Sequence, residues 1–204
     1  QLTKFLIAFF IYGLGVQTMI AFAAILASDF GIREMGLFVF TLQIAVTAGI
    51  TAIVVSRYQD RIGAKPTISI FLVVWMLSTG GLLLAKLTGA ASGSNQWIFW
   101  VIGNGIGIGL GGIGPSSRSM VGLFAPTARV GEFFGLWGMT YKLAGAVGVL
   151  SFGQVKAWMG DAPALALLTS FFVFGLILLM SVSVPKGIRA AKQANRQARN
   201  AARV

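Results

Sequence analysis

The chain has 204 residues, of which 56% are hydrophobic and only 10% are charged, and it carries a formal net charge of +11. A soluble domain of this length needs many more charges to cover its surface, so a mean hydropathy of +0.84 predicts a polytopic membrane protein. We attribute the positive charge to membrane topology and expect no nucleic-acid partner. Cysteine and histidine are both absent, which excludes disulfides, thiolate nucleophiles, imidazole bases and the usual zinc or haem ligands, and we expect no cofactor.

Six long apolar stretches follow one another along the chain. They cover residues 2–27, 35–55, 67–84, 97–114, 133–158 and 164–184. Each reaches or approaches the roughly 20 residues with which a helix crosses about 30 Å of hydrocarbon. Continuous apolarity over such lengths excludes a barrel, whose strands alternate. The sequence therefore predicts an all-α membrane protein with six transmembrane helices.

The positive-inside rule predicts the orientation. With both termini cytoplasmic, twelve cations lie on the inner side and three on the outer side. The inner set is Lys4, Arg57, Arg61, Lys65, Arg118, Arg129, Lys186, Arg189, Lys192, Arg196, Arg199 and Arg203, and the outer set is Arg33, Lys86 and Lys156. We therefore expect both termini in the cytoplasm of a multi-pass protein of a plasma, inner or organelle membrane.

The acidic residues argue against an intramembrane enzyme. The five acids, Asp29, Glu34, Asp60, Glu132 and Asp161, all fall at connections between the predicted spans. Intramembrane proteases, proton pumps and metal transporters usually need a buried carboxylate or histidine. We expect neither a catalytic site nor a metal site.

The connection between the second and third spans, residues 56–65, carries the most specific local motif. Its sequence Ser-Arg-Tyr-Gln-Asp-Arg-Ile-Gly-Ala-Lys resembles the cytoplasmic Gly-x-x-x-Asp-Arg-x-Gly-Arg-Arg/Lys loop of the major facilitator superfamily. The resemblance implies a conformational latch formed by Asp60, Arg61, Gly63 and Arg129. We expect Asp60 to dock at the start of the fifth span, near residues 131–134, because a carboxylate is stabilised by the positive end of a helix dipole. The alternative is a solvated turn that follows the charge rule.

Further motifs resemble the vacuolar amino-acid effluxer-like branch of that superfamily. The segment 12–18, Tyr-Gly-Leu-Gly-Val-Gln-Thr, is similar to the Tyr-Asn-Asp-Gly-Val-Gln-Thr stretch that opens its C-terminal half. Residues 117–119 and 132–135, followed by Lys142 and Gly148, match its fourth and fifth spans. Gly13 and Leu14 replace the Asn-Asp pair, and Val149 replaces a proline. If the missing acid serves coupling or substrate contact in the family, this chain has lost that function.

The resemblance implies one half of a secondary transporter. We expect the C-terminal six-helix half of a carrier that moves a small polar metabolite, with an amino acid as one candidate, by alternating access. The chain would then be a fragment or a processed piece, completed by an N-terminal half or a second copy. The alternative is a non-transporting scaffold or assembly subunit derived from such a half.

Three polar residues within the spans are the candidate substrate-binding residues. Lys142 lies near the middle of the fifth span, where a lysine facing lipid costs roughly 2.5 to 3.5 kcal/mol, so we expect it to point into a wet cavity. Its alternative role is a structural cation bonded to helix carbonyls or to a missing half. Gln17 and Gln43 are weaker candidates, because glutamines in spans often only join helices.

Glycine and tryptophan in the spans are expected to serve packing. The run 103–114 contains a formal Gly-x-Gly-x-x-Gly, but it lies inside a span and lacks the preceding strand of a dinucleotide site. Its glycines are expected to let helices approach closely, and the fifth span offers a matching set at Gly135, Gly138, Gly145 and Gly148. Trp75 and Trp137 are expected to pack rather than to bind.

Two regions follow from the composition: a bundle, residues 1–185, and a basic tail, residues 186–204. The tail has six cations, no acid and mostly alanine between them. As a helix it would carry its cations on roughly one face, which suits adhesion to anionic lipid headgroups. A disordered topology anchor is the equal alternative.

Overall fold

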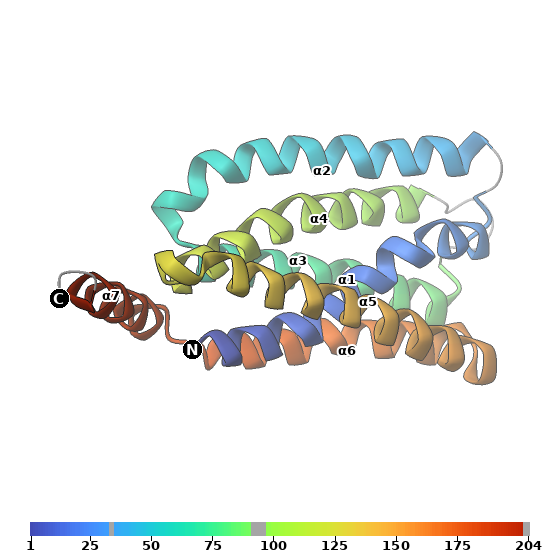
Figure 1. Ribbon diagram of the computed structural model, residues 1–204. Coiled ribbons are helices and arrows are strands. Elements are labelled where there is room, and N and C mark those ends of the chain that lie inside the picture. Colours follow the sequence, from blue (N-terminus) through green and yellow to red (C-terminus); the bar gives the residue numbers. More distant parts are fainter. Residues whose placement is uncertain (33–34, 91–96, 202–204) are drawn as a thin grey trace.

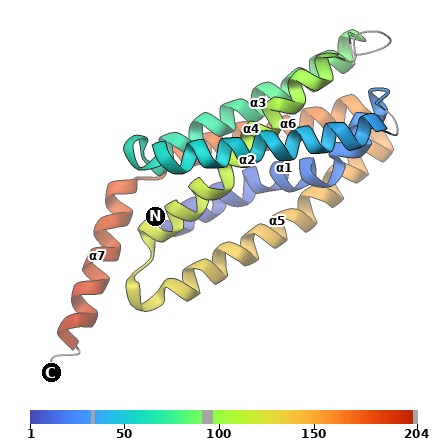
Figure 2. The ribbon, with the colours of Figure 1, turned by 90° about the horizontal axis from the view of Figure 1, so that it is seen from above.

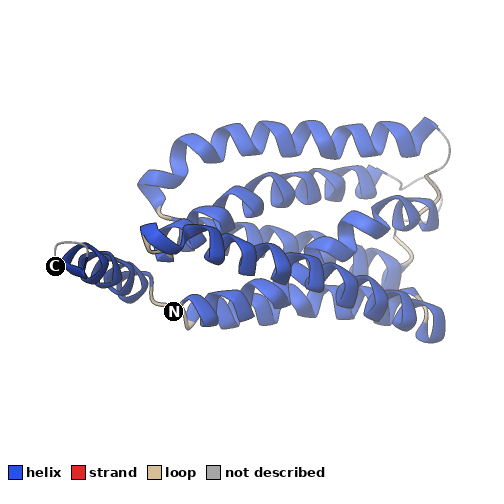
Figure 3. Cartoon of the chain, viewed as in Figure 1, coloured by secondary structure: helices blue, strands red, loops and turns tan. Residues whose placement is uncertain are grey.

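The computed structural model describes residues 1–32, 35–90 and 97–201, and nearly all of them are helical (Figure 3). The helices are α1 (Leu2–Asp29), α2 (Met35–Ile62), α3 (Ala64–Thr88), α4 (Trp97–Phe124), η2 (Thr127–Arg129), α5 (Val130–Met159), α6 (Asp161–Met180) and α7 (Val184–Ala201). Among the described residues, six helices, α1 to α6, are long and apolar enough to cross a membrane. The fifth of these spans includes the short 3-10 helix η2 as well as α5. The predicted six-span membrane fold is confirmed. Three charged residues used above, Arg33, Glu34 and Arg203, lie outside the described ranges.

Several helices run past the predicted ends of the apolar stretches. Residues 56–62, predicted to belong to a connection, form the last two turns of α2, which ends before Gly63 at a φ of +94°. Helix α4 continues through Pro115 to Phe124 because a transmembrane helix tolerates a proline where neighbouring helices support it. The sequence predicts Arg118 in a cytoplasmic connection. The structure instead places it inside α4.

The helices form an elongated bundle with both termini at the same end (Figure 1). Helix α4 packs against α2 and α3, α1 packs against α5 and α6, and the contact of α3 with α6 joins the two groups. Helices α2 and α5 are the least buried of the spans. A chain that crosses the membrane six times has both ends on the same side, and both termini of the bundle do lie at one end.

Glycines of α4 form two contact stripes. Gly103, Gly107 and Gly111 face α2: a Cβ at Gly107 would lie 2.8 Å from the Cβ of Thr47 and 2.9 Å from the Ile44 carbonyl oxygen. Gly105, Gly109 and Gly112 face α3, where Gly109 meets the indole of Trp75. The glycine run is thus a packing element, as predicted, because a side chain at these positions would push the helices apart.

The matching glycines of α5 behave differently from one another. Gly148 packs on the backbone of Leu14 and Gly145 faces Gln17, both on α1. A Cβ at Gly135 or Gly138 would meet no atom within 4 Å. Of the four glycines predicted to pack, only Gly145 and Gly148 therefore serve helix packing within the bundle.

A network of ion pairs joins four helices at the end of the bundle away from the termini. The Lys156 Nζ contacts Asp29 at 2.5 Å and also pairs with Asp161, while Lys86 reaches Asp161 at 2.6 Å. These residues belong to α5, α1, α6 and α3. Because all four side chains are at least partly shielded from solvent, their mutual attraction is stronger than that of a fully exposed pair.

The basic tail forms α7, which runs crosswise from the end of the bundle that carries the N-terminus (Figure 2). Its small residues face the bundle: Gly187 packs on the Phe124 ring, Ala191 is buried, and Asn195 Oδ1 accepts a hydrogen bond of 2.8 Å from the Thr127 N–H. The described cations of the tail, Lys186, Arg189, Lys192, Arg196 and Arg199, are all exposed. The tail is a helix with one cationic face, and adhesion to headgroups stays a prediction.

Candidate functional site

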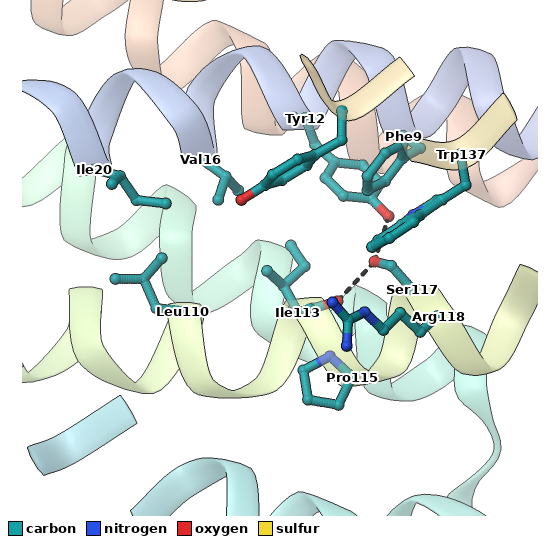
Figure 4. A pocket seen from close by; sticks show the side chains of 13 residues that line it. Phe9, Tyr12, Val16, Ile20, Leu110, Ile113, Pro115, Ser117, Arg118 and Trp137 are labelled. Carbon is teal, nitrogen blue, oxygen red and sulfur yellow. Dashed lines mark hydrogen bonds between the residues drawn. The ribbon is translucent and has the colours of Figure 1, made fainter. Parts of the chain in front are cut away.

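A cavity of about 550 Å³ lies between α1, α4 and α5 (Figure 4). Side chains from these three helices converge on it and most of them are apolar or aromatic. The lining residues are Phe9, Tyr12, Gly13, Val16, Ile20, Leu110, Ile113, Gly114, Pro115, Ser117, Arg118, Trp137 and Tyr141. Its volume falls within the range of pockets that bind small molecules.

A buried hydrogen-bond chain fixes one wall of the cavity. The Ser117 hydroxyl donates to the Ile113 carbonyl oxygen at 2.6 Å, as serines in helices often do. The same hydroxyl oxygen lies 2.8 Å from the Tyr12 hydroxyl. Because a serine has only one hydroxyl proton, Tyr12 must be the donor of this second bond. The Tyr12 hydroxyl oxygen therefore keeps its capacity to accept a hydrogen bond.

An aromatic cluster forms another part of the wall, and the charge of the cavity lies against it. The Trp137 indole packs on Phe9, with centroids 5.5 Å apart, and on Tyr141, at 5.9 Å, while the centroids of Phe9 and Tyr141 are 6.2 Å apart. The guanidinium carbon of Arg118 lies 5.3 Å from the centroid of the Trp137 ring. This distance allows a cation–π interaction, which holds the guanidinium at the cavity without neutralising it.

The three predicted substrate-binding residues do not line this cavity. Lys142 is exposed on α5, and no hydrogen bond or ion pair of its ammonium group forms with the described residues. Gln17 lies half-buried beside Gly145 at the α1–α5 contact. The Gln43 side chain donates a 2.9 Å hydrogen bond to the Trp100 carbonyl oxygen and so joins α2 to α4. Their role in binding substrate stays a prediction.

The predicted latch residues are separate in this structure. Arg129 pairs with Glu132 at 2.5 Å, and Asp60 is exposed without an ion-pair partner among the described residues. Arg61 is also exposed, whereas Gly63 lies between α2 and α3 with a φ of +94°, a backbone conformation that favours glycine. Docking of Asp60 on the start of α5 stays a prediction.

A different residue of the same motif is anchored. The Lys65 Nζ donates hydrogen bonds to the carbonyl oxygens of Met180, at 2.9 Å, and Val182, at 2.8 Å. A cation at this place suits the negative C-terminal end of α6. The connection between α2 and α3 is thereby attached to the end of α6.

The sequence does not predict the residues that build the cavity. Its charge pattern places Arg118 among the cytoplasmic cations, and Trp137 is predicted only to pack. A usable signal existed in the spacing of Phe134, Trp137 and Tyr141, which places three aromatic rings on one face of a helix. The partner face of α1, with Phe9 and Tyr12, shows the same spacing, but only the fold brings the two faces together.

Comparison with known proteins places the chain in a family. The sequence model of the vacuole effluxer Atg22-like family matches residues 1–192. The chain is also similar to the MFS-type transporter YxiO of Bacillus subtilis (strain 168), with 26% identity over 192 residues that make up 94% of this chain. Those residues correspond to 43% of the relative, so the chain spans less than half of its length. With its six membrane-spanning helices, the chain is an integral multi-pass membrane protein that belongs to the vacuole effluxer Atg22-like family.

Proposed function

We propose that the chain acts as the C-terminal six-helix half of a secondary transporter, which moves a small polar metabolite across the membrane by alternating access. An amino acid is the first substrate to test. In this proposal both termini lie in the cytoplasm, and a second six-helix half, from the same protein or from another copy, faces α2 and α5. The family supports transport as the activity and gives no support to an enzymatic role.

The position of Lys142 is the observation that carries the proposal. Lys142 is the thirteenth residue of α5, which places it about 18 Å along the helix axis. Its neighbours Leu143 and Met139 are exposed apolar residues, and its charge has no partner within the described bundle. Contact with lipid at this depth would cost roughly 2.5 to 3.5 kcal/mol. A wet cavity closed by a second half avoids that cost.

The surfaces of α2 and α5 support the same arrangement. Both helices expose large apolar side chains along most of their length: Phe38, Leu42, Val46, Ile50 and Ile53 on α2, and Leu136, Met139, Leu143, Val147 and Leu150 on α5. A membrane-spanning surface of this kind contacts either lipid tails or other helices. A second half would cover part of the exposed surface of α2 and α5, leaving the rest to lipid.

Uptake by the naturally encoded protein in liposomes tests the proposal. Radiolabelled amino acids are offered to vesicles that contain the wild-type protein, the Lys142→Met variant or the Lys192→Met variant. Lys192 is an exposed lysine of α7 and serves as the matched control. We expect the wild type and Lys192→Met to accumulate substrate. Uptake by Lys142→Met should fall about tenfold, because the substrate loses a hydrogen bond to a charged group.

Two other results have clear meanings. Equal uptake by Lys142→Met and the wild type would remove Lys142 from the transport mechanism. If no reconstituted form takes up any amino acid or small metabolite, and the protein purifies in a stable complex with an unrelated membrane assembly, then the scaffold function replaces transport.

A further inference from the structure

The cavity contains a single fixed charge within the described residues. Arg118 lies six residues before the end of α4, or about 9 Å along the helix axis from Phe124. None of the described residues that line the cavity is acidic. The described acids all lie at helix ends, where Asp29 and Asp161 pair with lysines and Glu132 pairs with Arg129. The Arg118 charge is therefore not neutralised by the bundle.

The placement of the Arg118 side chain leaves its donors available. A guanidinium group carries five N–H donors in its plane, and contact with the face of an indole uses none of them. The side chain is exposed and makes no hydrogen bond to the described residues. Two parallel N–H groups of a guanidinium match the two oxygens of a carboxylate, which makes the carboxylate its best small partner.

A second free donor lies on the same ring. The Nε1 of Trp137 is buried and has no hydrogen-bond partner in the described structure. The Tyr12 hydroxyl oxygen provides an acceptor within the same cavity.

The other walls determine what else the ligand must carry. Val16, Ile20, Leu110 and Ile113 are aliphatic, and the Phe9 ring is apolar. The Ser117 hydroxyl is already committed to Ile113 and Tyr12. Apart from Arg118, Tyr12 and the Trp137 and Tyr141 polar groups, the cavity thus offers only apolar contact.

From these observations we infer that the cavity between α1, α4 and α5 binds an organic carboxylate with an apolar body, and that Arg118 holds the carboxylate. The inference deepens the transport function proposed above, because it names the substrate class. The face of the Trp137 ring supports the guanidinium through the cation–π contact. A ligand with a positive charge and no carboxylate is repelled by Arg118 and finds no acid among the described residues that line the cavity.

Binding of three related probes to the purified, naturally encoded protein tests the inference. The probes are 3-phenylpropionate, L-phenylalanine and phenethylamine, which share an apolar body and differ in their charged groups. Calorimetric titration is carried out on the wild type and on Arg118→Gln, Arg118→Lys and Trp137→Phe. Arg189→Gln, which removes an exposed arginine of α7, is the matched control. Thermal unfolding of each variant confirms that it is folded.

We expect the wild type to bind 3-phenylpropionate and L-phenylalanine and to reject phenethylamine. Arg118→Gln should bind both carboxylates at least about tenfold more weakly, since a hydrogen-bonded charge is lost. Arg118→Lys should fall between the two, because it keeps the charge and loses the paired donors. Trp137→Phe should weaken binding less than Arg118→Gln, and Arg189→Gln should bind like the wild type.

Three results would overturn the inference: no binding of either carboxylate by the wild type, binding of phenethylamine as tight as that of 3-phenylpropionate, or equal affinity of Arg118→Gln and Arg189→Gln. Uptake into liposomes is measured in parallel. Carboxylate binding that depends on Arg118, without uptake by the wild type, would support the site and refute transport.

Discussion

At the scale of single residues, charge placement within this chain follows two different rules. Some cations at helix ends pair with acids or with terminal carbonyl groups, as Lys65 and Lys156 show. Lys142 and Arg118 instead lie within helices and lack an acidic partner among the described residues. The first group stabilises the bundle, and the second group is free to meet a ligand or another half.

Lys65 allows a direct test of the first rule. Lys65→Met removes both hydrogen bonds to the end of α6 and leaves the Met180 and Val182 carbonyl oxygens with fewer partners. We expect a loss of about 1 to 2 kcal/mol in the free energy of unfolding. Thermal unfolding in detergent measures it, with Lys192→Met as the control. An unfolding temperature equal to that of the control would show that Lys65 does not anchor α6.

At the scale of elements, α4 can approach α2 and α3 closely because it has glycines at the contact positions. A Cβ at Gly111 would collide with the backbone carbonyl of Ala48 on α2. Gly122, on the same helix, has no atom within 4 Å of such a Cβ. The two glycines therefore form a matched pair for mutation.

We expect Gly111→Ala to destabilise the protein by roughly 1 to 3 kcal/mol, because α2 and α4 must separate. Gly122→Ala should be neutral or slightly stabilising, since alanine favours a helix over glycine. Unfolding temperature and the yield of monodisperse protein measure both effects. Equal behaviour of the two variants would contradict the close contact of α2 with α4.

The helices themselves were predictable from the sequence, whereas several of their ends and the site were not. Length and apolarity are local properties, so all six spans are found. The polar residues 56–62 continue α2, and Pro115 does not stop α4, because the surrounding helices decide where a helix ends. The cavity needs three helices at once, so Phe9, Arg118 and Trp137 could not be assigned to one site from spacing alone.

At the scale of the whole molecule, labelling of single introduced cysteines can measure the orientation in the membrane. No native cysteine of this region has to be removed first. The 204 residues contain no cysteine, so single cysteines can be introduced at Thr88, at the end of α3, and at Ala198, in α7. We expect a membrane-impermeant maleimide to label Thr88→Cys in intact cells and Ala198→Cys only after permeabilisation. The protein without an added cysteine is the control. Labelling of both sites in intact cells, or the reverse pattern, would contradict the proposed orientation.

The ion pairs that join α1, α3, α5 and α6 also shape the electric field along the bundle. Two lysines and two aspartates cancel at that rim, while the opposite rim, with α7, keeps a large excess of positive charge in the described residues. The molecule is thus electrically polar along its long axis, and a negatively charged solute between the rims is pulled toward the termini. The force weakens as electrolyte concentration rises.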